Sequence, residues 1–70
     1  MTPAELKAIR AAMGVSPERL GADMGVTGRT VRYWESGRSP IPGMAARLLR
    51  RLAEAEEVAA EMRAQREIRS

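Results

Sequence analysis

The sequence contains no cysteine and no histidine, and its only aromatic residues are one tryptophan and one tyrosine. The absence of cysteine excludes disulfides and thiolate chemistry, and the absence of histidine excludes an imidazole base and the ordinary zinc sites. The glycines do not form a phosphate-binding loop motif. We therefore expect no metal, no cofactor and no enzymatic activity.

Long apolar runs are also missing from the sequence. No stretch approaches the roughly 18 apolar residues that a membrane-spanning helix needs, and the N-terminus lacks the charged-then-apolar pattern of a signal peptide. These absences favour a cytoplasmic protein without membrane contact. With 70 residues, the chain is expected to form one small domain. A chain of this size buries only about 60% of its unfolded surface.

Charge is distributed unevenly along the chain. Residues 1–53 carry nine basic and four acidic side chains, a net charge of +5, whereas residues 54–70 carry three basic and five acidic ones, a net charge of −2. Eleven of the twelve basic residues are arginine, whose planar guanidinium suits phosphate groups and guanine edges. The composition favours a nucleic-acid partner for the first part of the chain.

Residues 16–25 carry the start and stop signals of a short helix. Ser16 followed by Pro17 predicts an N-cap and a first helical position. Gly25 stands just past the last turn, where glycine adopts a positive φ without a steric clash. The sequence therefore predicts a helix over residues 17–24 with a tight turn after it.

A second short helix is predicted over residues 28–36, with Thr27 as its N-cap. Val31 and Trp34 lie three residues apart and form its buried stripe. An aromatic residue near arginines can stack on single-stranded bases, but the place of Trp34 on the inward stripe favours the core.

This second helix has another face that does not point to the core. That face, together with the helix tip and the loop that follows, carries arginines, threonines, serine, glycine and the only tyrosine. A short helix that exposes such a face is suited to the major groove of DNA. The alternative is a basic face that is merely solvated. The predicted DNA-binding residues are Arg29, Arg32, Tyr33, Thr27, Gly28, Thr30, Arg38 and Ser39, with Ser16 and Arg19 on the preceding helix.

The first helix of the chain is predicted over residues 3–13. Thr2 and Glu5 have the spacing of a capping box, in which each side chain accepts a hydrogen bond from the other residue's backbone N–H. Gly14 ends the helix. Its inward stripe is Leu6, Ile9 and Met13.

Residues 42–70 are predicted to form one long helix. Its apolar stripe is Met44, Leu48, Leu52, Ala55, Ala59 and Met62. Its first turns are expected to cover the core at Leu6, Ile9, Val31 and Trp34. The rest cannot reach that core, so it either frays in solvent or packs against another chain. We favour dimerisation through Leu52, Ala55, Val58, Ala59 and Met62.

Several of these positions together resemble the helix-turn-helix of the small phage and bacterial repressors related to the lambda and 434 repressors and Cro, the XRE-type family. The resemblance covers roughly residues 4–52. It is carried by Leu20, Gly21, Met24, Gly25, Val26, Val31 and the run WESGR from Trp34 to Arg38. The runs LKAIR and YWESGR are also similar to a narrower branch that includes the anti-CRISPR-associated autorepressors of phages and mobile elements.

The resemblance implies an ion pair between Arg10 and Glu35 that ties the first helix to the second helix of the motif. Two positions depart from the family pattern. Pro17 stands where many members carry a glutamine that touches phosphate, and Gly21 stands where alanine is common. The first departure removes one expected phosphate contact, and the second weakens the helix by about 1 kcal/mol.

We therefore predict an all-α fold, a compact helix-turn-helix bundle of three short helices with a long C-terminal helix. Residues 1–53 form the DNA-binding part, and residues 42–70 the dimerisation element. The predicted function is a homodimeric repressor of a phage or mobile element, with the helix at residues 28–36 in the major groove of a palindromic operator. The alternative is an antitoxin-type interaction module whose last helix binds a partner protein, and RNA binding by the basic part also remains open.

Overall fold

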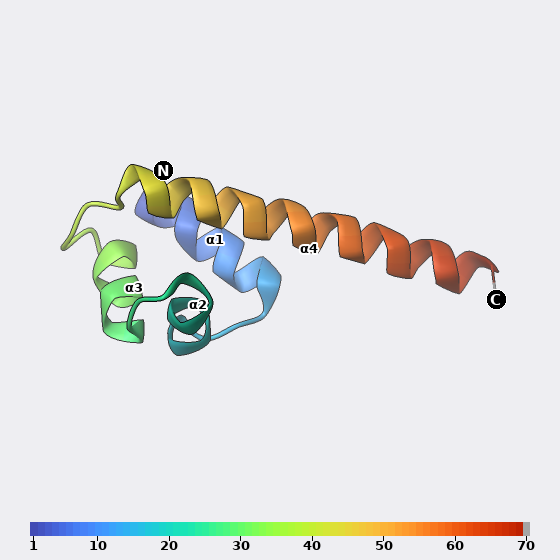
Figure 1. Ribbon diagram of the computed structural model, residues 1–70, viewed down its shortest axis with the longest axis horizontal. Helices are drawn as coiled ribbons and strands as arrows, with labels where there is room; N and C mark the ends of the chain where they lie inside the picture. Colours follow the sequence, from blue (N-terminus) through green and yellow to red (C-terminus); the bar gives the residue numbers. More distant parts are fainter. Residues whose placement is uncertain (70) are drawn as a thin grey trace.

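The computed structural model describes residues 1–69, and within that range the regular structure is four α-helices. They are α1 (Pro3–Met13), α2 (Pro17–Met24), α3 (Gly28–Glu35) and α4 (Gly43–Arg69). Figure 1 shows α1, α2 and α3 gathered beneath one end of α4, whose other end extends alone. The molecule measures 46 × 19 × 19 Å. The predicted all-α class is confirmed.

Local capping residues set the ends of the short helices. The hydroxyl of Thr2 accepts a hydrogen bond from the backbone N–H of Glu5 at 3.1 Å, and the Glu5 carboxylate accepts one from the N–H of Thr2 at 3.3 Å. Gly14 and Gly25 follow α1 and α2 with φ of 69° and 77°. These left-handed conformations end each helix at a residue without a Cβ.

The core lies where the three short helices meet the first turns of α4. The indole of Trp34 belongs to it and is only 5% exposed, as its position on the inward stripe predicts. Partly buried apolar side chains from the start of the chain, the ends of α1 and α2, the turns and α4 complete the packing. The buried residues of the cluster are Leu6, Leu20, Val31, Trp34 and Leu49.

The prediction of which face of α4 covers the core needs correction. Leu49 is fully buried, whereas Met44 is 83% exposed and Leu48 is 36% exposed. Because successive residues of a helix are about 100° apart, the stripe that begins at Met44 lies beside the buried face. Of the predicted stripe, Leu52 packs against the core.

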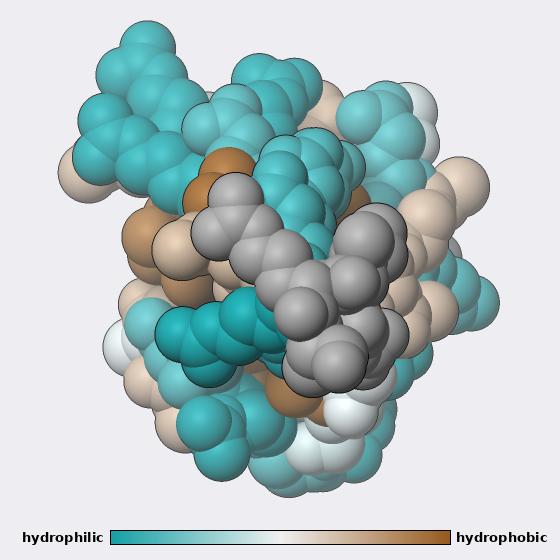
Figure 2. Space-filling model, turned by 90° about the vertical axis from the view of Figure 1, so that its right-hand side faces the viewer, coloured by the Kyte–Doolittle hydropathy of each residue, from teal (hydrophilic) through white to brown (hydrophobic). Residues whose placement is uncertain are grey.

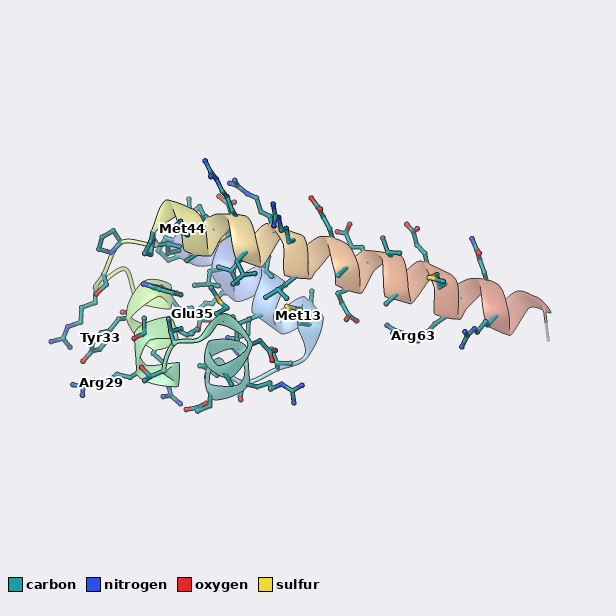
Figure 3. The ribbon with its side chains drawn as sticks, viewed as in Figure 1. Met13, Arg29, Tyr33, Glu35, Met44 and Arg63 are labelled. Atoms are coloured by element: carbon teal, nitrogen blue, oxygen red, sulfur yellow. The ribbon has the colours of Figure 1, made fainter. Side chains whose placement is uncertain are left out.

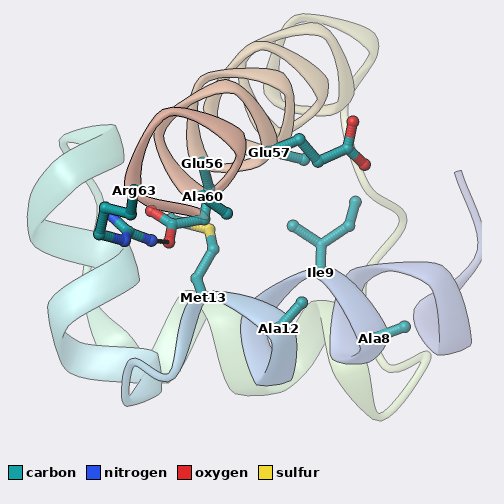
Figure 4. A pocket seen from close by; sticks show the side chains of 9 residues that line it. Ala8, Ile9, Ala12, Met13, Glu56, Glu57, Ala60 and Arg63 are labelled. Atoms are coloured by element: carbon teal, nitrogen blue, oxygen red, sulfur yellow. Dashed lines mark hydrogen bonds and ion pairs between the residues drawn. The ribbon is translucent and has the colours of Figure 1, made fainter. Parts of the chain in front are cut away.

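A hollow separates the second half of α1 from α4, and Figure 4 shows Ile9 and Met13 facing it. Ile9, which was expected beneath the first turns of α4, lies here and is only partly buried. On the α4 side, Arg63 donates to Glu56 at 3.2 Å. Past this hollow, α4 is no longer covered by α1 in Figure 1.

Candidate nucleic-acid interface

The junction of α2 and α3 is unusually tight, and this fixes how α3 is presented. A Cβ on Gly21 would lie 2.7 Å from the carbonyl oxygen of Val26, and one on Gly28 would lie 2.9 Å from the Cα of Glu18. Gly28, predicted to face DNA, therefore packs against α2 instead. The two glycines let the turn and both helices approach closely.

The inner face of α3 is anchored to α1 by the ion pair that the resemblance implies. Arg10 donates from Nε and Nη2 to the Glu35 carboxylate at 2.9–3.1 Å, and from Nη1 to the carbonyl of Val15 at 3.1 Å. The side chain of Glu35 is 6% exposed and that of Arg10 is 23% exposed. The pair holds α3 to α1 and to the turn before α2, which limits how α3 can rotate.

Three residues form a cluster on the outer face of α3 and just beyond its end. Arg29 donates from Nε to the Tyr33 hydroxyl at 2.8 Å, and the Arg38 guanidinium lies 4.7 Å from the centre of the Tyr33 ring. Both arginines are exposed, and Figure 3 shows Arg29 and Tyr33 pointing away from the bundle. The ring positions two cations at one end of the molecule, where they can reach base edges or phosphates.

The tip of α3 presents two hydroxyls. Thr27 is the N-cap and accepts a hydrogen bond from the N–H of Thr30 at 3.2 Å, and the two hydroxyls lie 3.1 Å apart. Both side chains sit at the positive end of the helix dipole, which favours an anionic ligand such as phosphate.

Arg32 does not lie free on the outer face as predicted. It forms an ion pair with Glu18 of α2, although both side chains remain more than half exposed. The pKa of Glu18 is lowered, first by a hydrogen bond from its own backbone N–H near the start of α2 and then by Arg32. Arg32 therefore links α2 to α3 and has donors left for a phosphate.

The comparison with known protein families agrees with this geometry. The model of a family described as a helix-turn-helix domain matches residues 4–67. The chain belongs to the helix-turn-helix domain family. No curated protein and no solved structure matches the chain. α2 and α3, joined by a tight turn, have the arrangement of the two helices of a helix-turn-helix motif, and a helix-turn-helix domain is a DNA-binding fold that typically has no catalytic activity.

Two backbone N–H groups in the loop after α3 are bonded within the chain and are not free for phosphate. The backbone N–H of Ser39 donates to the carbonyl of Tyr33 at 3.2 Å, and that of Gly37 donates to the carbonyl of Trp34 at 3.3 Å. Both N–H groups therefore donate to carbonyl groups in the last turn of α3. Phosphate contact from this loop therefore rests on side chains, chiefly that of Arg38.

The weaker candidates on α2 lie at its exposed start. The Ser16 hydroxyl accepts a hydrogen bond from the N–H of Arg19 at 3.1 Å, and the Arg19 guanidinium donates to Asp23 at 3.4 Å. With 69% of its side chain exposed, Arg19 can still turn toward a phosphate.

Lys7 is a further cation near the motif that the sequence patterns did not single out. It lines a shallow hollow at the start of α2 together with Arg10, Pro17, Arg32, Glu35 and Ser36. These residues come from three helices, so their meeting depends on the fold. The sequence signals that include Lys7 are the basic character of this part of the chain and the run LKAIR, and neither indicates a contact with the motif.

The described part of the chain contains neither a membrane-spanning helix nor a metal-binding cluster. Among residues 1–69, no helix is both long and apolar enough to cross a membrane. Among residues 1–66, whose side chains the structure describes, no group of acidic side chains is arranged to hold a metal ion.

Proposed function

We propose that this helix-turn-helix protein is a sequence-specific, homodimeric transcriptional repressor of the lambda, 434 and Cro type, encoded by a phage or mobile element. It lays α3 in the major groove of a palindromic operator, with half-sites about 10 bp apart. Occupying the operator excludes the polymerase, and no chemistry is needed. Within this type, an autorepressor of the anti-CRISPR-associated branch is the narrower proposal.

The observation that carries this proposal is the exposed cluster of Arg29, Tyr33 and Arg38 on a helix whose other face is buried. The Tyr33 ring and hydroxyl hold both guanidinium groups, so their freedom is already reduced before DNA is bound. A guanidinium held in this way can pair with O6 and N7 of guanine. Arg32, Lys7 and the hydroxyls at the tip of α3 are proposed to hold phosphates, which fix the register without reading sequence.

The proposal is tested by footprinting the protein on the region upstream of its own gene and then measuring the affinity of variants for the protected site. Arg29→Ala should weaken operator binding about tenfold to a hundredfold, equivalent to 1–3 kcal/mol, with a smaller loss on random DNA. Lys7→Ala should weaken binding to both DNAs equally and reduce the salt dependence.

Arg66→Ala is the matched control, because it removes an exposed arginine far from α3. No protected site near the gene, or equal losses for Arg29→Ala on operator and random DNA, would contradict sequence-specific reading by α3.

A further inference from the structure

Part of an apolar stripe on α4 is exposed, although Ala45 and Leu52 of this stripe also pack against the core. Within the stripe Leu48 is 36% exposed and Met62 is 58% exposed, and Met44 and Val58 beside it are also exposed. Figure 2 looks at the molecule from the C-terminal end of α4 and shows hydrophobic side chains reaching the surface between charged ones. The stripe begins at an apolar hollow lined by Met24, Val26, Trp34, Pro42, Met44, Ala45 and Leu48.

The stripe has alternating spacings of three and four residues. Taken from Ala45 instead of Met44, it runs in order along α4 through Leu48, Leu52, Ala55, Ala59 and Met62. Spacings of three and four residues place these side chains in one seam of the kind that pairs two helices. The first half of the seam holds one alanine followed by two leucines. The second half holds two alanines followed by a methionine.

Charge divides along the same helix. Arg47, Arg50 and Arg51 lie in its first half. Glu54, Glu56, Glu57 and Glu61 follow. Two copies of α4 in parallel would set arginines beside arginines and glutamates beside glutamates. Two antiparallel copies set the basic segment of each beside the acidic segment of the other.

We propose that a second copy of this chain covers the stripe, with its α4 antiparallel and a two-fold axis between Leu52 and Ala55. This deepens the proposed homodimer and rests on it. Leu52 then faces the partner's Ala55, Leu48 faces the partner's Ala59, and Ala45 faces the partner's Met62. Every layer pairs one large side chain with one alanine, and the partner's Met62 enters the hollow beside Trp34.

Neighbouring registers fit less well. Sliding one helix by seven residues sets Leu52 against the partner's Met62 and Ala55 against the partner's Ala59. The first of these layers crowds two large side chains together, and the second leaves a gap between two alanines. Both crowding and gaps are unfavourable in a packed interface. The proposed register also brings the edge with Arg51 alongside the partner's Glu54.

This pairing leaves both DNA-binding faces on one side of the dimer. Leu48, in the seam, lies about 100° around the helix from Leu49, which faces the bundle. The bundle therefore lies to one side of the plane that contains the two paired helices. A two-fold axis perpendicular to that plane keeps both bundles on the same side. Figure 1 places α3 at the end where α4 begins. From Gly43 to the axis is about 16 Å of helix rise, so the two ends lie about 32 Å apart along α4. One turn of DNA, the spacing of half-sites, is about 34 Å.

Single-cysteine cross-linking tests the pairing, because the full chain has no native cysteine. Leu48→Cys and Ala59→Cys are mixed without DNA, one of them carrying a mass tag, and oxidised. The expected product is the mixed disulfide dimer. Each variant alone should give none, since in antiparallel copies its two cysteines are separated by about 16 Å along the helix, and a disulfide needs Cα atoms within about 7 Å.

Glu57→Cys, on the opposite face of α4, is the matched control and should not link to Leu48→Cys. Far-UV circular dichroism of each variant checks that α4 is folded. Self-linked dimers of both variants would indicate parallel helices, and a monomer in sedimentation at all concentrations would exclude the pairing; either result overturns the inference. Because no DNA is present, these outcomes are independent of whether the protein recognises an operator.

Discussion

At the scale of single residues, Gly21 shows how close the motif's turn lies to α2. Alanine at an ordinary helix position is about 1 kcal/mol more favourable than glycine. Here its Cβ would meet the Val26 carbonyl oxygen at 2.7 Å and the Thr27 backbone carbon at 2.9 Å, and backbone cannot move aside as a side chain can. We expect Gly21→Ala to lower the free energy of unfolding by about 2 kcal/mol, measured by urea denaturation.

Gly43→Ala is the control for that substitution, because a Cβ at Gly43 would have no neighbour within 4 Å. It should leave stability unchanged or slightly raised. A Gly21→Ala protein at least as stable as the unsubstituted chain would show that the turn can move away at no cost.

The Arg10–Glu35 pair is the second residue-scale test. Removing the carboxylate leaves a mostly buried guanidinium without its charged partner, so Glu35→Ala should cost about 3 kcal/mol of unfolding free energy. Asp23→Ala breaks the exposed pair with Arg19 and should cost less than about 1 kcal/mol. Thermal melts of the two variants compare them directly, and equal small losses would mean that the Arg10–Glu35 pair adds no stability.

At the scale of elements, the helix ends were predictable and the burial of α4 was not. Thr2, Ser16 and Thr27 cap their helices through neighbouring residues, so sequence alone identifies these signals. Leu48 and Leu49 are adjacent leucines in one helix, and either could be the buried one by pattern. Only packing against α1 and α3 selects Leu49.

The same limit applies to the candidate site. The outward position of Arg29 and Tyr33 follows from helical spacing within α3. By contrast, the contact of Arg32 with Glu18 joins residues fourteen apart, and Lys7 reaches the motif from another helix. The Arg10–Glu35 pair was implied only by the family resemblance, because nothing in the local pattern links two residues on different helices.

The α2–α3 link gives a test by pH. The pKa of Glu18 is lowered in the fold by its own backbone N–H and by Arg32. Its contribution to stability is therefore present above its unfolded pKa and is lost as the pH falls through the lower, folded pKa. In Arg32→Ala, the pKa of Glu18 measured by NMR titration should rise, yet stay below its ordinary value because the backbone hydrogen bond remains. An unchanged pKa would mean that the ion pair does not form in solution.

At the scale of the whole molecule, the proposed dimerisation would link the helix-turn-helix to the part of α4 that extends beyond the bundle. A single bundle offers one recognition helix, and two bundles held at a fixed spacing gain affinity because the second binds at high effective concentration. The proposed seam makes this dependence testable with one added charge. Ala59→Glu places a carboxylate in the apolar seam against the partner's Leu48, and burying a charge in an apolar layer is unfavourable.

We expect the Ala59→Glu protein to be monomeric in sedimentation and to bind the operator at least tenfold more weakly. Its affinity for random DNA should fall only by the effect of one added negative charge. Ala64→Glu adds the same charge on the opposite face of α4 and should remain dimeric with nearly unchanged operator affinity. Because both substitutions lie outside the buried core, circular dichroism should show the same helix content. A dimeric Ala59→Glu protein would mean that the two copies meet elsewhere, and a monomer that still binds the operator tightly would separate DNA recognition from dimerisation.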